Sequence, residues 1–442
     1  MPGEDMMEIA GRVVETAIRK GAAEAAVGAY RSRQVEVQWR DGRVEKITEA
    51  TTRGLGLEIY VANRYSAVST SDLRPEALDK FIGDAIALAR TLAPDPFRAL
   101  PDPKLYAGQS EVELQVEDPG QPAVTPAARL DRARALEAAA RPAGTKAPIL
   151  SVTTGVGDNL TEIWRIHSNG FDGRRRETMF WSSAEVSVQD PDGRKPEETD
   201  EAVTRLLADL PDAASVGQRA CARAQGRVGA RKGGSAVMSV AVDARVAGRF
   251  VSYLLQPMSA AALQQKRSCF DGKIGAVVGS AQLDVSDDPL VVKGLGSRRF
   301  DGEGLAARRL PLFTAGTLTS IYVDNYYGKK LGMPPTTGSR SNLSWKLGEK
   351  SQPELLAQMH DGILVTGFLG GNSNPTTGDF SLGVLGFYVR GGAIAEPFAE
   401  MNMSGNHLET WKHLTALGND PYPYSSSRTP TMLLESMQIA GT

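Results

Sequence analysis

The N-terminal segment changes from a helical to a strand-like spacing of apolar side chains. Apolar residues recur three and four positions apart from Met6 to Ala17, which predicts an amphipathic helix that ends at Gly21. Apolar and polar residues then alternate over residues 35–39, as on a half-buried strand. Asp41-Gly42 follows, and this dipeptide favours the tight turn of a β-hairpin. A helix followed by a hairpin is therefore predicted.

The next stretch predicts two more strands, a helix and a connector. Two short strands turn near Asn63, and a helix covers residues 75–92 with a proline in its first turn, where the missing N–H costs nothing. Residues 93–108 are rich in proline, so we expect them to form a connector on the surface. Residues 1–95 are thus predicted as a first subunit of helices and strands.

The same order of elements returns after the connector. Residues 126–140 are rich in alanine and arginine and predict a helix, three strand-like stretches follow, and a helix over residues 201–228 closes the segment. We interpret residues 110–230 as a second subunit of the same kind. Residues 1–230 together are predicted to form an N-terminal α+β domain of helices and antiparallel strands.

The pattern in residues 231–442 is different. Short apolar strands are separated by glycine, aspartate and asparagine about every ten residues, which is typical of antiparallel β structure. A helix over residues 244–263 interrupts this pattern. The predicted fold class is therefore α+β, with a largely antiparallel, barrel-like C-terminal β domain that contains a few helices.

A second helix is predicted to begin at Asn406 in the C-terminal part. Asn406 and Glu409 have the spacing of a capping box, and Gly418 supplies a stop. The apolar side of this helix would consist of Leu408, Trp411, Leu414 and Leu417.

Composition narrows the classes of protein to consider. The chain has 442 residues, 41% of them apolar and 23% charged, and a net charge of −2, so its surface as a whole does not attract nucleic acid or anionic lipid. Two cysteines argue against a disulfide scaffold and fit a reducing compartment. The N-terminus lacks the apolar core of a signal peptide, and no apolar window reaches the length of a membrane span. We therefore expect a cytoplasmic protein without a membrane partner.

The usual catalytic motifs are absent from the sequence. None of the four histidines stands in an HExxH motif, and His407 and His413 lie six positions apart, which turns a helix through roughly 600° and separates the two rings. We interpret them as two partly exposed helix histidines. Cys221 and Cys269 are interpreted as small buried residues rather than metal ligands. There is no GxSxG motif and no phosphate-binding glycine loop.

Arginines form two clusters, Arg174–Arg176 and Arg298–Arg299, with Arg308–Arg309 near the second. A positive patch of this kind is one way to bind nucleic acid. Acidic residues lie close to both clusters and weaken their long-range field. We therefore favour a solvated strand edge, and a nucleic-acid partner is not expected.

Long ordered motifs, however, resemble a known family. They are VEVQWRDGRVEKITEATTRGLGLEIYV, HSNGFDGRRRE, DDPLVVKGLGSRRFDGEGLAARR, YVDNYYGKKLGMPPTTG, NPTTGDFSLGVLGFYVRGGAIAEP and MSGNHLETWKHLTALGND. Almost the whole chain resembles the TldD/PmbA family, whose older name is putative modulator of DNA gyrase. The resemblance implies a pair of related subunits. TldD-type chains hold zinc with HExxxH and a cysteine near the C-terminus, whereas TldE/PmbA-type chains lack these ligands.

The helix that corresponds to the zinc helix decides which type this chain resembles. That helix is VAGRFVSYLLQPMSAAAL, in which Ser252 stands for the first histidine, Tyr253 for the glutamate and Pro257 near the second histidine. None of the three suits zinc, the general base is missing, and the C-terminal GNDPYPYSSSRTPTMLLESMQIAG contains no cysteine. The resemblance is therefore to the TldE/PmbA type. It implies no catalytic residue and no cofactor in this chain, with zinc in a TldD-type partner.

The stretch GNSNPTTGDFSLG resembles a hairpin that the family shares, with residues 377–379 in its turn. Its glycines are expected to permit positive φ and close backbone approach. In a heterodimer this hairpin would lie near the cleft between the subunits. The candidates for contact with a peptide or a partner are Asp379, Phe380, Ser381, Asn406 and His407. The alternative for each of them is a purely structural role.

The resemblance implies a non-catalytic subunit of a TldD/TldE-type zinc metallopeptidase that processes unfolded or leader peptides. One alternative is a stand-alone homodimeric peptide-binding protein without peptidase activity. A weaker alternative is a gyrase modulator associated with nucleic acid through the arginine clusters.

Overall fold

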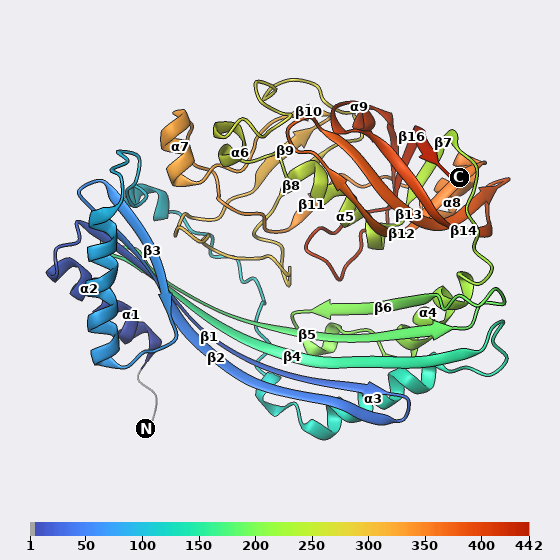
Figure 1. Ribbon diagram of the computed structural model, residues 1–442, viewed down its shortest axis with the longest axis horizontal. Helices are drawn as coiled ribbons and strands as arrows, with labels where there is room; N and C mark the ends of the chain where they lie inside the picture. Colours follow the sequence, from blue (N-terminus) through green and yellow to red (C-terminus); the bar gives the residue numbers. More distant parts are fainter. Residues whose placement is uncertain (1–4, 442) are drawn as a thin grey trace.

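The computed structural model describes residues 5–441, and its N-terminal part is built on one antiparallel sheet (Figure 1). The strand order is β3-β2-β1-β4-β5-β6. The two predicted subunits share this sheet, because β1 pairs with β4 from Ala26↔His167 to Arg40↔Thr153. The strands are β1 (Glu24–Arg40), β2 (Arg43–Val61), β3 (Arg64–Thr70), β4 (Ile149–His167), β5 (Asp172–Val188) and β6 (Glu197–Thr204).

The predicted turn between the first two strands is confirmed. Asp41 and Gly42 connect β1 to β2 and have φ values of 46° and 82°. Two successive positive φ values match the twist of a hairpin, which is the physical reason for the Asp-Gly preference.

Four helices cover one face of this sheet, and the C-terminal part lies over the other, concave face (Figure 1). Val27 and Ala29 pack against the first pair of helices, and Val37 and Trp39, on the same face of β1, pack against the second pair. The intervening positions of β1, such as Ser32, therefore face the C-terminal part. The helices are α1 (Met6–Arg19), α2 (Pro75–Thr91), α3 (Pro126–Ala140) and α4 (Ala213–Gly226).

The predicted helix over residues 201–228 is wrong at its N-terminal end. Residues 201–204 belong to β6, which pairs with β5 up to Phe180↔Thr204. Alternate side chains there are buried, so strand pairing overrides helix propensity. The helix begins only at Ala213, where the side chain of Asp212 caps it by accepting a hydrogen bond from the N–H of Ser215.

The C-terminal part contains a small five-stranded barrel. The sheet order is β14-β13-β12-β7-β16-β15, and an additional pairing of β14 with β16 closes the first five strands into the barrel. β7 and β12 run parallel, whereas the other pairs are antiparallel. The α+β fold class with a barrel-like C-terminal domain is thereby confirmed. The strands are β7 (Ala236–Val242), β12 (Gly362–Ser373), β13 (Asp379–Arg390), β14 (Ala393–Asn406), β15 (Leu414–Leu417) and β16 (Met432–Ala440).

A second, four-stranded sheet and several short helices accompany the barrel. The sheet order is β10-β9-β8-β11, and its core is continuous with that of the barrel. The elements are β8 (Val285–Asp287), β9 (Leu310–Thr314), β10 (Thr317–Leu318), β11 (Leu343–Trp345), α7 (Asn325–Leu331) and α8 (Gln352–Met359).

The predicted helix over residues 244–263 is two helices. α5 (Ala244–Leu255) ends just before Pro257, and α6 (Ala260–Gln264) begins after the capping residue Ser259. Proline has no N–H to continue the ladder and disfavours a helical residue before it, so the helix stops there.

The predicted helix from Asn406 to Gly418 is wrong beyond its first turns. Asn406 caps α9 (His407–Thr410) by accepting a hydrogen bond from the N–H of Leu408, a 3-10 turn follows, and Leu414–Leu417 then forms β15. β15 pairs with β16 from Leu414↔Leu434 to Leu417↔Met432. The apolar residues are still buried. Residues 414–417 form a strand rather than another helical turn because the backbone groups at the edge of β16 need hydrogen-bond partners.

The proline-rich connector lies against α7 and thereby links the N-terminal part to the C-terminal part. Tyr326 Oη donates to Asp95 at 2.6 Å, and Asn325 Nδ2 donates to the carbonyl of Ala99 at 2.8 Å. Leu100 of the connector is buried. The division of the chain into domains at residue 230 stays a prediction. Within residues 5–441, no helix combines the length and hydropathy needed to cross a bilayer.

Candidate functional site

The three residues that the resemblance aligns with the HExxxH motif lie on and just after α5. Ser252 is half-buried, and its Oγ donates to the carbonyl of Arg249 in the same helix at 2.7 Å. Tyr253 packs against the barrel core. Pro257 is buried, and its carbonyl accepts a hydrogen bond from Ser268 Oγ at 2.8 Å. Ser252, Tyr253 and Pro257 are therefore each engaged in the local structure.

The C-terminal loop packs against the same helix. Thr429 Oγ1 donates to the carbonyl of Ala244 at 2.9 Å. A Cβ added to Gly248 would lie 3.2 Å from Cβ of Ser427, so glycine is what permits this close approach. Ser252 is one turn further along the same helical face. The fold thus brings helix and loop together, but with hydroxyl groups at the meeting point.

The hairpin between β12 and β13 presents one of the contact candidates at its turn. Asp379 is the first residue of β13 and is exposed. Its carboxylate accepts hydrogen bonds from Asn406 Nδ2 at 2.8 Å and Thr377 Oγ1 at 2.7 Å, and these bonds lower the pKa of Asp379. The Asn406 side chain also caps α9, so one amide orders both the turn and the helix start.

Neighbouring residues of β13 point to opposite sides. Phe380 is buried, with 4% of its surface exposed, whereas Ser381 is exposed like Asp379. Asp379 and Ser381 border an open cavity of about 510 Å³ that the turn residues also line. Gly371 lies opposite with φ of 116°, and a Cβ added there would lie only 2.2 Å from the carbonyl oxygen of Ser381, so the expected role of glycine holds at this position.

His407 is buried beneath this hairpin, and the interpretation of a partly exposed helix histidine is wrong for it. Its ring lies 4.8 Å from that of Phe380, and only 1% of its surface is exposed. His413 is exposed, as predicted. Burial lowers the pKa of His407 to about 4, so the ring is neutral at pH 7.

Ser373 and His407 are within hydrogen-bond distance, but they do not form a nucleophile–base pair. Trp411 Nε1–H, which can only donate, points at His407 Nδ1 at 3.2 Å. The neutral ring therefore carries its proton on Nε2 and donates it to Ser373 Oγ at 3.1 Å. A protonated Nε2 cannot accept the serine proton, so serine activation is excluded in this arrangement.

The two arginine clusters meet at one cavity between β5 and the C-terminal part. Arg175 and Arg176 lie on an edge of β5 that β6 does not cover, as predicted, but their side chains are half-buried rather than freely solvated. Arg174 and Arg299 are exposed, and Arg308–Arg309 do not line the cavity. β6 pairs with β5 only from Phe180 onwards. The edge of β5 beside the arginines is therefore not covered by β6 and can be contacted by another segment.

Comparison with known proteins identifies the family. Models of the PmbA/TldA metallopeptidase match in three places: domain 1 over residues 25–89, the central domain over residues 119–228 and the C-terminal domain over residues 235–441. The chain belongs to the PmbA/TldD metallopeptidase family. The resemblance seen in the sequence motifs is thereby confirmed.

Relatives within the PmbA/TldD family match over the whole chain. Metalloprotease PmbA of Escherichia coli O157:H7 is 27% identical over 450 residues, which covers 99% of this chain and 97% of that protein. A crystal structure from Bacteroides thetaiotaomicron, described as a proposed modulator of DNA gyrase, is 32% identical with a TM-score of 0.95 and full coverage of both chains. TldE of Thermococcus kodakarensis shares the fold, with a TM-score of 0.85, 19% identity and coverage of 98% of this chain and 100% of that one.

Zinc, which the PmbA/TldD family implies, does not fit the residues of this chain. Within residues 5–441, no group of three or more His, Cys, Asp or Glu side chains is placed to hold a metal ion. Cys221 and Cys269 are both buried, as predicted, and burial raises the pKa of each thiol, which disfavours the thiolate that binds metals. At α5 the available donors are hydroxyls, which are not among the ligands that zinc sites use. No hydrolytic step through a metal is derived for this PmbA/TldD family member.

Sequence reasoning missed two residues that shape this site. Phe250 of α5 stacks on Trp411 with ring centroids 4.9 Å apart and connects the helix to the hairpin. Ser373 meets His407 from a position 34 residues away in the chain. Phe250 lies within the predicted helix over residues 244–263 but was not singled out, and no local pattern marks Ser373.

The buried His407 predicts acid sensitivity in this PmbA/TldD family member. Because its pKa falls from 6.5 to about 4 on folding, the unfolded chain binds a proton at pH values where the folded chain does not. The free energy of unfolding should therefore fall as the pH drops from about 6.5 to about 4, by up to about 3 kcal/mol from this group. Urea unfolding at a series of pH values measures the slope.

The variant His407→Gln should be less stable at pH 7 but show a shallower loss towards pH 4. His413→Gln, which changes an exposed histidine in the same segment, is the matched control and should keep the wild-type slope. Equal slopes for wild type and His407→Gln would contradict the prediction.

Proposed function

We propose that this chain is the non-catalytic, TldE/PmbA-type subunit of a TldD/TldE-type zinc metallopeptidase that processes unfolded or leader peptides. The observation that carries the proposal is the composition of the α5 site. The resemblance aligns Ser252, Tyr253 and Pro257 with HExxxH, and the loop that packs on α5 brings Ser427 and Thr429 rather than a cysteine. Neither a zinc ligand nor a general base is available there.

The full-length match to metalloprotease PmbA of Escherichia coli supports the assignment to a peptidase system. The TldD-type partner would supply the zinc, the activated water and the general base. This chain would close the cavity and hold the peptide or the partner through Asp379 and Ser381, whose exposed side chains stand on a hairpin that Asn406 orders. Phe380 and His407, both buried, would support that surface from below. Two buried free cysteines support a place for the pair in the cytoplasm.

The test measures zinc and peptidase activity in three samples. The isolated chain should hold no stoichiometric zinc by elemental analysis and should not cleave an unfolded peptide. Co-expression with a TldD-type chain carrying HExxxH should yield a complex on size exclusion, with stoichiometric zinc and peptide cleavage. A TldD-type chain whose HExxxH glutamate is changed to glutamine is the matched control, and its complex should be inactive.

Tight zinc together with peptide hydrolysis in the isolated chain would overturn the proposal. A homodimer that does not exchange with the TldD-type chain would also overturn it, and would support a stand-alone binding protein.

A further inference from the structure

A cavity of about 540 Å³ lies where β5, the segment after the connector and a loop of the C-terminal part meet. This volume is within the range of small-ligand sites. One wall is the segment 113–119, a second is residues 174–177 of β5, and the third is residues 297–300. Ser252, Tyr253 and Pro257 do not line it, and neither do the contact candidates around Asp379.

Backbone hydrogen bonds hold the segment 113–119 to both other walls. The N–H of Thr178 on β5 donates to the carbonyl of Val116 at 2.9 Å, and the N–H of Lys293 donates to the carbonyl of Leu114 at 2.7 Å. The guanidinium of Arg299 donates to the carbonyl of Val112 at 3.1 Å. The cavity is therefore preformed, and binding need not order its walls first.

Most arginines at this cavity already have partners. Arg174 pairs with Glu162 at 3.0 Å, and Arg176 pairs with Glu117 at 3.1 Å. The guanidinium of Arg298 donates to the carbonyls of Ser339 and Arg340. The guanidiniums of these three arginines already bond to other groups of the protein, so few of their N–H donors remain for a ligand.

Arg175 differs from them. Its side chain lines the cavity, and its Nε is buried without a hydrogen-bond partner, as is that of Arg176, but Arg175 lacks an ion pair like the one between Arg176 and Glu117. Within residues 5–441 its guanidinium makes no hydrogen bond or ion pair. A half-buried cation with unused donors is costly unless something outside the chain satisfies it.

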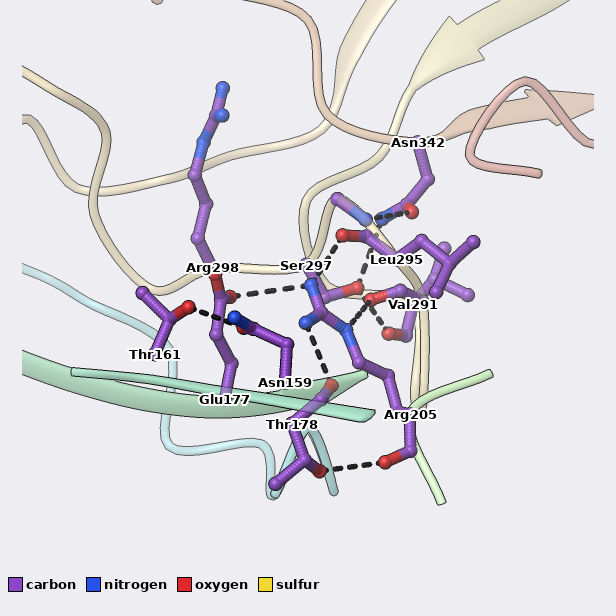
Figure 2. A network of polar contacts seen from close by, with 12 residues as sticks. Asn159, Thr161, Glu177, Thr178, Arg205, Val291, Leu295, Ser297, Arg298 and Asn342 are labelled. Carbon is purple, nitrogen blue, oxygen red and sulfur yellow. Dashed lines mark hydrogen bonds and ion pairs between the residues drawn. The ribbon is translucent and has the colours of Figure 1, made fainter. Parts of the chain in front are cut away.

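Two further guanidiniums surround Arg175 and increase this cost. Burial lowers the pKa of Arg205 and of Arg298, and the charge of Arg175 lowers both further. Figure 2 shows Arg205 engaged with Glu177 and with backbone carbonyls, and the ion pair between them is 3.3 Å long, so the carboxylate of Glu177 is already paired with Arg205. Among the residues that line the cavity, arginines outnumber glutamates by two. A concave site with excess positive charge attracts anions.

We propose that this cavity binds a carboxylate of a peptide through the guanidinium of Arg175. The planar fork of a guanidinium matches a carboxylate with two parallel hydrogen bonds. Glu113, Glu117 and Glu177 in the walls repel a polyanion such as nucleic acid, whereas a single carboxylate offsets part of the local excess of positive charge. Leu114, Val116 and Phe300 supply apolar surface for a neighbouring side chain. That the carboxylate belongs to a peptide rests on the proposed function.

The experiment uses the full-length isolated chain and short alanine–leucine peptides that carry an uncharged fluorophore at the N-terminus. One peptide has a free C-terminal carboxylate, the second is amidated, and the third is amidated but carries one internal glutamate. Fluorescence anisotropy should show binding of the peptide with the free C-terminal carboxylate if the site takes a C-terminus, or of the peptide with the internal glutamate if it takes a side chain. The amidated peptide without glutamate should bind more weakly than either. Arg175→Gln should weaken carboxylate binding about tenfold or more, the loss of a charge-assisted pair.

Arg309→Gln is the matched control, because it removes one exposed positive charge outside the cavity, and it should bind like wild type. Arg175→Gln should also melt at the same temperature as wild type or higher, since Arg175 makes no internal bond and repels its neighbours. This melting measurement separates lost binding from lost folding.

Equal binding by Arg175→Gln and wild type would overturn the site. So would equal binding of the amidated peptide without glutamate, an equal loss in Arg309→Gln, or preferential binding of inorganic phosphate or an oligonucleotide. The assay needs no TldD-type partner. If Arg175 does not bind a carboxylate but the complex with the TldD-type chain is active, the site is wrong and the proposed function stands. If Arg175 binds a carboxylate but no active complex forms, the site stands and the proposed function is wrong.

Discussion

Replacing Arg205 by methionine is expected to lower the free energy of unfolding by about 3–5 kcal/mol. Arg205 follows β6, has 5% of its surface exposed, and joins the sheet to the C-terminal part. Its guanidinium donates to the carbonyls of Gly294 and Leu295 on one side, and to the carbonyl of Thr178 and the carboxylate of Glu177 on the other. Methionine keeps most of the volume but leaves these acceptors unpaired, including a largely buried carboxylate.

Urea unfolding of the full chain measures this loss. Arg205→Lys is the matched variant, since it keeps the charge but cannot supply four directed bonds, and it should lose less than methionine. The double change Arg205→Met with Glu177→Gln should recover part of the loss, because it removes the unpaired charge. A change below about 1 kcal/mol for Arg205→Met, the range of an exposed ion pair, would show that this contact does not hold the two parts together.

Truncating Phe250 to alanine is expected to destabilise the C-terminal part by about 3–5 kcal/mol. Its ring is fully buried between α5 and the hairpin, with centroids 4.9 Å from Trp411, 5.5 Å from Phe380 and 6.1 Å from His407. Alanine would leave a cavity beneath the surface that carries Asp379, so the same variant should weaken the support of that surface.

Tryptophan fluorescence during urea unfolding follows this change, since Trp411 lies directly on the ring. Phe250→Leu fills most of the space and should cost about 1.5 kcal/mol or less. Tyr253→Ala, on the same helix but only partly buried, should cost less than Phe250→Ala. A loss in Phe250→Ala no larger than that in Phe250→Leu would contradict the packing account.

Elements whose signals are local were predictable from the sequence. The helix over residues 126–140 matches α3, because Thr125 caps it, Pro126 fits its first turn and a run of alanines follows. The Asp41-Gly42 turn follows from backbone sterics within two residues. Asn406 was predicted as a cap and is one, because a cap needs only its own side chain and the next two N–H groups.

Elements that depend on distant partners were not predictable in this way. Residues 414–417 have a spacing that fits a helix, yet they form β15 because β16 offers them a free edge. Residues 201–204 join β6 because β5 lies beside them. The arginine clusters are separated by more than a hundred residues, so no local charge pattern shows that Arg175 and Arg298 face one cavity.

By itself the sequence determined the family, the fold class and the donor types at the positions that the resemblance aligns with the zinc ligands, since Ser252, Tyr253 and Pro257 offer the same atoms in any conformation. Only the tertiary structure decided that one sheet joins the two N-terminal subunits, that β14 and β16 close a barrel, and that His407 is buried with its proton on Nε2. It also decided that Arg175 finds no hydrogen-bond or ion-pair partner among residues 5–441. The physical reason is range. Residue chemistry and backbone preference act within a few positions, whereas pairing, burial and charge balance depend on segments that only folding brings together.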